Sequence, residues 1–333
     1  MRAFLRSGVL RIDTLTAGCI SGGALLVALI VDRLYGEPAA RWHPVVWIGH
    51  YLGWAGARVA PLVVVEPPLK SRANWRIFWG ATFYWVAGAV MVVLLAALLQ
   101  YAASNLHSIV AALVLGCALK PFLAWFMLRD EVLAVETALS GSLHAGRARL
   151  AWLVSRDVQS LTESQIRESA IESLAENLND SVVSPILWFV VAGLPGAALY
   201  RFANTADAMW GYTGERGGRH WQWAGKFAAR ADDVLSWPGA RVTALLVALL
   251  RSGRWVICLP HEARITPSPN SGWPMAAFAL ALNIRLGKPG VYVLNDAARA
   301  PVAQDVVNAI RLATAVVVSF VFLAEATIFG FSF

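Results

Sequence analysis

The chain has 333 residues, of which 58% are hydrophobic and 15% are charged, and its mean hydropathy is +0.56. Soluble domains carry roughly 25% charged residues and about 45–50% apolar ones, so this composition excludes a soluble globular fold and a disordered chain. The net charge of +7 suits a membrane protein with basic cytoplasmic loops. No basic run is interleaved with aromatic residues, and nucleic acid is therefore not expected as a partner.

The first apolar run covers residues 14–31 and follows Arg2, Arg6 and Arg11. Basic residues before an apolar run are also found in signal peptides, but no cleavage site of the A-x-A type follows here. The run ends in Val31-Asp32-Arg33 instead. We expect a retained segment, somewhat short for a membrane span.

Two strongly apolar segments follow, at residues 77–99 and 109–128, and the second is interrupted by Lys120 and Pro121. Each is long enough to cross a bilayer, which takes about 20 apolar residues. The turn at residues 100–108 contains no Lys or Arg, whereas both flanks are basic. The positive-inside rule therefore predicts an external turn and cytoplasmic flanks.

Residues 129–180 are mostly polar with helical character, and they predict a cytoplasmic helical region. Residues 182–200 are apolar but contain four prolines and glycines, and the basic segment 201–241 follows them. If both flanks of 182–200 are cytoplasmic, that segment is a re-entrant or buried element, which membrane proteins tolerate inside a protein environment. We expect cytoplasmic loops at about 201–241 and 260–305.

The last apolar segments are residues 242–259, which contain two arginines, and 312–331. Prolines between 260 and 274 predict a loop, followed by an apolar helix at 275–284. Together the segments predict a single all-α integral membrane domain over residues 1–333. About four to five transmembrane helices are expected, with re-entrant and cytoplasmic helical segments besides.

The three cysteines each lie in an apolar stretch without CxxC spacing. That pattern argues against a disulfide or zinc framework. We expect Cys19, Cys117 and Cys258 to be buried thiols.

Four carboxylates, Glu168, Glu172, Glu176 and Asp180, are spaced by four residues, and Asn177 lies beside them. This spacing places them on one helix face, where like charges repel by a few tenths of a kcal/mol per pair. A cation would relieve the repulsion, and Mg²⁺ binds a few carboxylates together with phosphate oxygens. The alternative is a solvated helix face.

Other polar groups lie before and after this row. Arg156 and Asp157 precede it, and an arginine there could hold a phosphate or carboxylate with two hydrogen bonds or form a local ion pair. Carboxylates beside apolar segments are costly unless they are paired or bind a ligand. This group comprises Asn204, Asp207, Asp232 and Asp233, with nearby arginines as alternative partners.

The segment from Thr266 to Pro274 combines rigid turns with the side chains of Ser268, Asn270 and Ser271. Such a loop could bind a phosphate or an amide-rich ligand, or it could be an ordinary turn. His43, in Arg41-Trp-His-Pro44, could likewise bind a substrate, or it could belong to an ordinary turn at the membrane interface. The sequence contains no GxxxxGK[ST], HExxH or GxSxG motif, so spacing alone predicts an acidic cytoplasmic site without naming a reaction.

These motifs, in their order, resemble the CobD/CbiB family, the cobinamide-phosphate synthases of cobalamin biosynthesis. The resemblance extends from about Asp32 to Arg311. The blocks that carry it are Asp32-Arg33, Gly36-Glu-Pro38, His43-Pro-Val-Val-Trp-Ile-Gly49, Arg156-Asp157, Glu172-Ser-Leu-Ala-Glu-Asn177, Asp180, Val182-Val-Ser-Pro185, Asn204-Thr-Ala-Asp207, Gly211-Tyr212, Asp232-Asp233 and Pro267-Ser-Pro-Asn-Ser-Gly-Trp-Pro274.

The resemblance implies a multi-pass enzyme of the bacterial inner membrane whose active site faces the cytoplasm. It would join adenosylcobyric acid to (R)-1-amino-2-propanol or its O-phosphate through an amide bond. ATP and Mg²⁺ are the implied cofactors, because a carboxylate needs activation before an amine attacks it. The implied partners are these substrates, the lipid bilayer and other cobalamin-assembly enzymes.

The resemblance and the residue patterns together assign three sets of site residues. The expected catalytic residues are Arg156, Asp157, Glu172, Glu176 and Asn177. The expected substrate-binding residues are His43, Asn204, Asp207, Ser268, Asn270 and Ser271. The expected metal ligands are Glu176, Asp180, Asp232 and Asp233.

Two other functions stay open at this point. The AmpE-like membrane proteins resemble the same family, so a noncatalytic regulator or sensor is one alternative. A transporter is the other, because acidic residues in broken helices can mark a solute path. A transporter predicts carboxylates at the bilayer midplane, whereas an enzyme of this kind predicts them in cytoplasmic segments.

Overall fold

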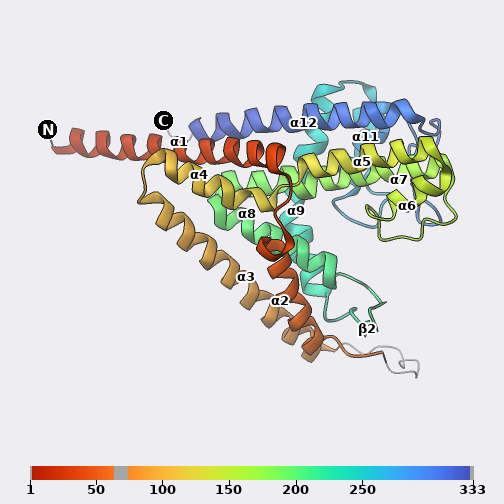
Figure 1. Ribbon diagram of the computed structural model, residues 1–333, viewed down its shortest axis with the longest axis horizontal. Coiled ribbons are helices and arrows are strands. Elements are labelled where there is room, and N and C mark those ends of the chain that lie inside the picture. The colour runs from red at the N-terminus through yellow and green to blue at the C-terminus, as the bar shows by residue number, and fades with distance from the viewer. Residues whose placement is uncertain (1, 64–73, 331–333) are drawn as a thin grey trace. The chain divides into compact units, whose positions relative to one another are not determined.

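The computed structural model describes residues 2–63 and 74–330, and within them the chain is almost entirely helical (Figure 1). The α-helices are α1 (Arg2–Tyr35), α2 (Pro44–Val59), α3 (Trp75–Ser104), α4 (Ser108–Leu119), α5 (Trp125–Gly141), α6 (Leu143–Leu150), α7 (Glu163–Leu178), α8 (Ser184–Trp210), α9 (Lys226–Leu250), α10 (Leu259–Glu262), α11 (Gly272–Leu282) and α12 (Ala303–Gly330). The shorter helices are the 3₁₀ turns η1 (Ala40–Trp42), η2 (Lys120–Phe122) and η4 (Arg254–Ile257) and the π-helix η3 (Asn179–Val183).

Strands occur only as two short antiparallel hairpins in the described part of the chain. One pairs β1 (Glu215–Arg216) with β2 (Arg219–His220). The other pairs β3 (Leu286–Lys288) with β4 (Tyr292–Leu294), in the register Leu286 to Leu294. The expectation of an all-α chain is therefore confirmed.

Six helical stretches of the described residues are long and apolar enough to cross a membrane. They are Thr16–Tyr35, Trp75–Ser104, Ser108–Gly141, Glu163–Trp210, Lys226–Leu250 and Ala303–Gly330. The chain is thus a multi-pass membrane protein, with one such stretch more than the four to five expected. The expected helical hairpin is present, because α3 packs on α4 across a short turn.

Residues 182–200, expected as a re-entrant or buried element, lie within the helical stretch Glu163–Trp210. Two helical segments of α8 meet there at a kink, because Ala192 and Gly193 have non-helical backbone angles. Gly193 has a φ of 63°. Glycine adopts this left-handed conformation without steric cost. The Gln100 side chain accepts a hydrogen bond from the Leu194 amide at 2.7 Å and so satisfies a backbone group that the kink releases.

The segment 201–241, expected as a loop, is mostly helix. Helix α8 continues to Trp210, the β1–β2 hairpin follows, and α9 begins at Lys226. The loop prediction relied on basic residues, but arginines on a partly exposed helix can keep their charge in water. Farther along, the 260–305 segment contains the predicted apolar helix as α11, although α10 adds a helical turn before the loop.

The chain divides into two compact units, each made of segments distant in sequence. The first unit is drawn from Met1–Leu123, Pro185–Ser236 and Ile328–Phe333, and the second from Ala124–Ser184 and Trp237–Thr327. In the first unit α1 lies along α4 (Figure 1). In the second, α7 packs against α5, α11 and β3.

Small residues bring α1 and α4 close together. A Cβ atom added to Gly116 of α4 would lie 2.6 Å from the Val27 side chain and 2.7 Å from the Ala24 carbonyl oxygen of α1. Membrane helices commonly associate by close backbone approach through glycine and alanine. Lipid chains are as apolar as the helix surfaces, so the hydrophobic effect does not drive this association and close packing does. Gly116 therefore fixes the distance between these two helices.

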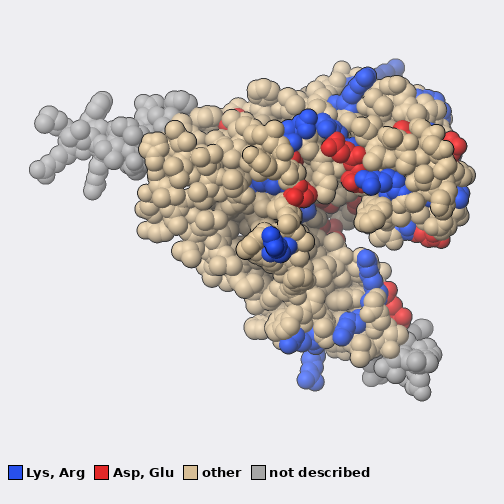
Figure 2. Space-filling view, viewed as in Figure 1, with Lys and Arg blue, Asp and Glu red and all other residues tan. Residues whose placement is uncertain are grey.

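Much of the helical surface is apolar and exposed in the isolated chain. Large side chains such as Phe83, Leu94 and Leu98 of α3 are 62–69% exposed, and the surface over α3 and α4 in Figure 2 carries few charges. Such a surface is stable where lipid covers it. The three cysteines are exposed rather than buried, because the apolar sequence around Cys19 and Cys117 belongs to helices that face lipid as well as protein.

Replacing Gly116 by alanine is expected to lower the thermal stability of the purified protein. The added methyl group must push α1 from α4, and overpacking of this kind costs about 1–3 kcal/mol. Thermal unfolding in detergent measures the effect. The matched control is Gly80→Ala in α3, where a Cβ atom has no described atom within 4 Å; equal destabilisation by both changes would contradict the packing argument.

Candidate functional site

The acidic row is carried mainly by α7, whose first turn is fixed by a capping box. Thr162 accepts a hydrogen bond from the Gln165 amide, and the Gln165 side chain accepts one from the Thr162 amide. Glu168, Glu172 and Glu176 follow within the α-helix, as predicted, whereas Asp180 lies in the π-helix η3. A π-turn inside a helix is a rare conformation that frequently occurs at functional sites.

Two of these carboxylates are buried and paired with arginines. Glu172 is 1% exposed, and its Oε2 atom lies 3.2 Å from Arg156, which also donates to the Ser169 hydroxyl at 3.3 Å. Glu168 is 3% exposed and accepts a hydrogen bond from Arg285 at 3.0 Å. The alternative of a solvated helix face is therefore wrong for these two residues.

The next carboxylate, Glu176, is half-buried among charges of both signs. The charged groups that act on it are the carboxylates of Asp180 and Glu172 and the cations of Lys288 and Arg156. The cations come from two different places in the chain, the loop before α7 and strand β3. The acidic row thus faces a basic set, and an anionic ligand and a cationic ligand could both find complementary charge here.

The β3–β4 hairpin packs on α7 and adds Tyr292 to this site. The Tyr292 hydroxyl lies near Glu172 and donates to the sulfur of Met275 at 3.7 Å. Burial raises the pKa of Tyr292, and the neighbouring Glu172 carboxylate raises it further. Tyr292 therefore stays protonated at neutral pH and can donate a hydrogen bond to a ligand oxygen.

We define the α7 cluster as Arg156, Glu168, Glu172, Glu176, Asp180, Arg285, Lys288 and Tyr292. One polar atom of this cluster is incompletely satisfied: Oε1 of Glu172 is buried and has no hydrogen bond of regular geometry among the described residues, and the Tyr292 hydroxyl is the neighbouring donor that interacts with this carboxylate. A buried carboxylate oxygen without a regular hydrogen bond is costly, so this atom is suited to a ligand that brings a donor or a cation.

The carboxylates of the cluster decide whether it could hold a magnesium ion. No group of three or more His, Cys, Asp or Glu side chains in the described ranges could hold a metal by itself. Magnesium, however, is usually held by one or two carboxylates together with substrate phosphates and water. Glu176 and Asp180 supply two such carboxylates close to each other, so the residues fit a magnesium ion that arrives with a phosphate ligand.

Two other residues that were predicted as catalytic make local contacts. Asp157 is exposed, and its carboxylate accepts a hydrogen bond from the Gln159 amide at 2.9 Å. Asn177 donates to the carbonyl oxygen of Ser173 at 2.9 Å. Neither contact brings these side chains to the charged groups of the cluster, and the Arg156–Asp157 ion pair that was considered is replaced by Arg156–Glu172.

Five predicted site residues belong to the first unit, namely His43 and the four polar residues of α8 and α9, whereas the α7 cluster belongs to the second unit. Asn204 accepts from Arg201 at 3.4 Å and donates to Asp232 at 3.5 Å. Asp232 also accepts from Ser236 at 3.3 Å. Asp207 and Asp233 are half-buried on α8 and α9. These contacts of Asp232 are thus with an amide and a hydroxyl, and Arg201, one of the arginines considered as partners, contacts Asn204.

His43 belongs to a second charged group, which the sequence did not predict. Its Nδ1 atom accepts the Val45 amide at 3.2 Å and caps α2. The other ring nitrogen therefore carries the proton and donates to Glu37 at 3.0 Å. Glu37 also pairs with Lys120 at 2.8 Å, and Lys120 pairs with Asp32 at 3.3 Å. We call these four residues the Lys120 quartet.

The predicted substrate loop is held together by its own side chains. Ser268 accepts hydrogen bonds from the amides of Asn270 and Ser271 at 3.2 Å each. Asn270 is 5% exposed and accepts a hydrogen bond from Arg241, which also donates to the Pro269 carbonyl at 2.9 Å. The Arg241 guanidinium also lies 4.8 Å from the ring centroids of both Trp237 and Trp273. These contacts give Ser268 and Asn270 a structural role in the loop.

Three of the eight residues of the α7 cluster have no signal in the local sequence. Arg285, Lys288 and Tyr292 lie more than 100 residues beyond α7, and nothing in their local sequence marks them as its partners. Glu168 was seen in the acidic row but not selected. Lys120 did carry a signal, because a charged residue inside an apolar span is by default a candidate functional residue.

Replacing Asn270 by alanine is expected to destabilise the protein, because Arg241 then loses its side-chain acceptor. A buried donor that loses its hydrogen-bond acceptor lowers the free energy of unfolding by about 1–3 kcal/mol, and by more when the donor is charged. A lower midpoint of thermal unfolding in detergent is the expected readout. The nearby exchange Ser271→Ala, which removes a side chain without a hydrogen bond among those described, serves as the control; a fully stable N270A protein would contradict the structural role.

Comparison with known proteins identifies the family. The family model described as CobD/Cbib protein matches residues 25–318. The chain is 36% identical over 311 residues to a "Probable cobalamin biosynthesis protein CobD" of Methanothermobacter thermautotrophicus, covering 90% of this chain and 95% of that relative. It is 36% identical over 305 residues to cobalamin biosynthesis protein CobD of Chromobacterium violaceum, covering 86% and 90%. No solved structure matches; the sequence matches show that the chain belongs to the CobD/Cbib family.

Proposed function

We propose that this protein acts in cobalamin biosynthesis as an amide-forming ligase. It would join the free carboxylate of adenosylcobyric acid to (R)-1-amino-2-propanol or its O-phosphate, with ATP as the activating substrate. Family membership and the names of the relatives support the pathway. The observation that carries the reaction type is the α7 cluster, in which buried carboxylates and cations meet at one place.

The charges of the proposed substrates are complementary to the charged side chains of this cluster. The reacting carboxylate and the phosphates of ATP are anionic, and Arg156 and Lys288 would bind them, since arginine pairs well with carboxylates and phosphates. Transfer of the γ-phosphoryl group to the carboxylate would give an acyl phosphate and ADP. Attack by the amine would then form the amide and release phosphate.

The amine substrate arrives as an ammonium ion at neutral pH, so it must lose a proton before it attacks. We assign this proton transfer to Glu176, which would act as general base. Glu172 would hold the ammonium group through its incompletely satisfied Oε1 atom, and Tyr292 would donate a hydrogen bond to a substrate oxygen. Each role uses a group whose polar atoms face the same cluster.

Asp180 would hold Mg²⁺ in this proposal together with phosphate oxygens, and Glu176, which must accept the proton, would lie outside the ligand set. When bound with the phosphates, the ion would neutralise the charge that develops during phosphoryl transfer. The proposed location is the bacterial inner membrane with the α7 cluster on the cytoplasmic side. The distribution of basic residues around the 100–108 turn supports this orientation.

A direct assay tests the reaction. Purified protein mixed with adenosylcobyric acid, aminopropanol phosphate and MgATP is expected to give the cobinamide product, detected by mass spectrometry, together with an equal amount of ADP. Product without ATP consumption would contradict the activation step. A folded protein that binds no corrinoid and forms no product would favour the noncatalytic regulatory alternative.

The substitution Glu176→Gln is expected to lower the synthesis rate by about 10²–10⁴-fold, the range for loss of a general acid or base. Asp180→Asn, which removes a proposed Mg²⁺ ligand, is expected to lower the rate as well. Both exchanges preserve volume, so the thermal stability should change little. The matched control is Glu163→Gln on the same helix, because the Glu163 side chain is 62% exposed and exposed ion pairs contribute little. Full activity in both cluster variants would rule out the assigned roles.

A further inference from the structure

The first unit contains a cavity of about 550 Å³, within the range of about 300–1,000 Å³ typical of small-molecule sites. Its walls come from α1, η1, α2, α3, α4, η2 and α8, all within the first unit. The lining is apolar and aromatic, and Lys120 is its one charged residue among those described. No residue of the α7 cluster lines it, so the proposed amide-forming site leaves this cavity unexplained.

One wall of the cavity is a single face of α3. The α3 residues that line it are Met91, Val92, Leu95, Ala96 and Leu99, which recur at helical spacing. From residue 91 to residue 99 the helix rises by about 12 Å. The cavity, which we also call the channel, therefore follows a membrane-spanning helix over this distance, and its apolar wall suits a hydrocarbon chain.

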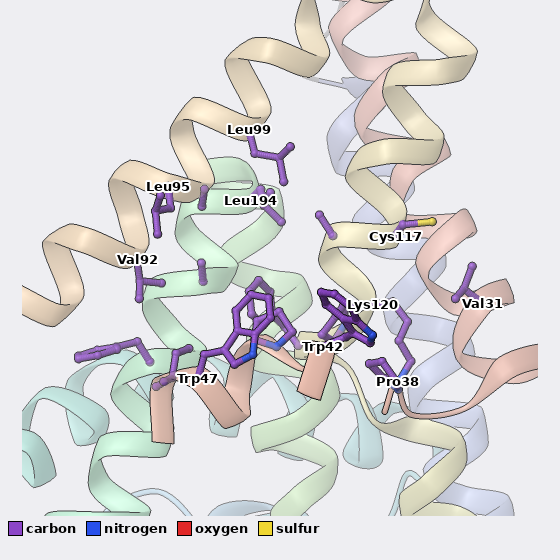
Figure 3. A pocket seen from close by; sticks show the side chains of 18 of the residues that line it. Val31, Pro38, Trp42, Trp47, Val92, Leu95, Leu99, Cys117, Lys120 and Leu194 are labelled. Carbon is purple, nitrogen blue, oxygen red and sulfur yellow. The ribbon is translucent and has the colours of Figure 1, made fainter. Parts of the chain in front are cut away.

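The two ends of this channel differ in chemistry. Figure 3 shows Trp42, Trp47, Pro38 and Lys120 at one end, whereas Leu99 and Leu194 lie at the other. Tryptophan side chains favour the headgroup level of a membrane, and aliphatic side chains favour its interior. One end of the channel is thus aromatic with a paired charge, and the other end is aliphatic.

The charged end is already neutralised by protein groups. The Lys120 side chain is 3% exposed and pairs with Asp32, which is fully buried, and with Glu37. The quartet fastens the segment that carries Pro38 and Trp42 to the end of α4, and so builds the end wall of the cavity. Because carboxylates already pair with its ammonium group, Lys120 does not favour a free fatty acid, whose carboxylate would have to compete with them.

The cavity is accessible from the surface that lipid covers. Two lining residues of α3, Leu95 and Leu99, are 61% and 39% exposed, and Trp42 and Trp47 are 66% and 51% exposed. Deeper lining residues such as Leu194 and Ala198 are 2% and 1% exposed. An acyl chain could therefore enter from the bilayer without first crossing water.

We propose that this cavity binds one acyl chain of a membrane phospholipid. The chain lies along α3, between Trp42 and Trp47 at one end of the cavity and Leu99 and Leu194 at the other. The bound chain fills apolar space between α1, α3, α4 and α8 that protein side chains leave open. This site is independent of the proposed function, because its residues and those of the α7 cluster lie in different units.

The test uses the full-length protein in phosphatidylcholine vesicles that contain a phosphatidylcholine with a diazirine at the end of one acyl chain. After illumination, peptide mass spectrometry locates the cross-links. Labelling is expected at Leu194 and Ala198, which lipid on the outer surface does not reach. Phe322 of α12, which is 72% exposed, reports contact with ordinary surrounding lipid and should be labelled as well.

The filling variants Leu95→Trp and Ala118→Phe occupy the cavity. Each is expected to lower labelling of Leu194 about tenfold, as a steric clash of overpacking size would do, with labelling of Phe322 unchanged. Two positions are used so that failure of one variant to fold leaves the other. The matched control is Leu94→Trp, which lies farther around α3 from the lining residues and is 62% exposed; it should preserve the labelling of Leu194.

Three results would overturn the proposal. The first is the absence of labelling at Leu194 and Ala198 in the unchanged protein. The second is equal labelling of Leu194 in the filled and unfilled proteins. The third is labelling of Leu194 by a diazirine-bearing free fatty acid but not by the phospholipid, which would assign the cavity to a different ligand. None of these outcomes bears on the assay for amide formation.

Discussion

The pairing of buried charges is the constraint on which both parts of this protein depend. A carboxylate or an ammonium group taken out of water loses its hydration, and only close counter-charges and hydrogen bonds compensate for that loss. In the second unit, Glu168 and Glu172 are nearly inaccessible and meet Arg285 and Arg156. Removal of one partner from such a pair costs about 3–5 kcal/mol, so these contacts fix the place of α7 among its neighbours.

The same constraint shapes the first unit in a more apolar setting. Lys120 interrupts an apolar stretch at the junction of α4 and η2, and Asp32 and Glu37 hold its ammonium group. Since Asp32 lies in α1 and Glu37 in the segment that follows, the pairings connect the first helix to the fourth. They also place Trp42 and His43 beside the cavity, which shows how a structural ion-pair network can shape an apolar binding space.

Geometry distinguishes the chemistry of the two charged groups. In the Lys120 quartet the buried Lys120 Nζ atom lies at ion-pair distance from Asp32 Oδ1 and Glu37 Oε1, and His43 contacts the other Glu37 oxygen, so the ion pairs involve the same buried atoms that lack regular hydrogen bonds. The α7 cluster also has a buried carboxylate oxygen without a regular hydrogen bond, and in addition its half-buried Glu176 lies between other carboxylates and cations. An incompletely satisfied cluster is costly for folding, and it is the arrangement expected where a substrate completes the interactions. Because Glu176 is half-buried among charges of both signs, the reaction is assigned to the α7 cluster and not to the quartet.

The sequence by itself determined the all-α membrane class, the α3–α4 hairpin, the single-face spacing of Glu168, Glu172 and Glu176, and the family. Hydropathy and helical periodicity depend on neighbouring residues and can be read locally. Tertiary structure alone decided which charges meet. It brought Arg285, Lys288 and Tyr292 to α7, assigned Asn270 to Arg241, and joined Asp32, Glu37 and His43 at Lys120. Such contacts join residues up to 120 positions apart, as Tyr292 and Glu172 are, and packing selects them rather than any local pattern.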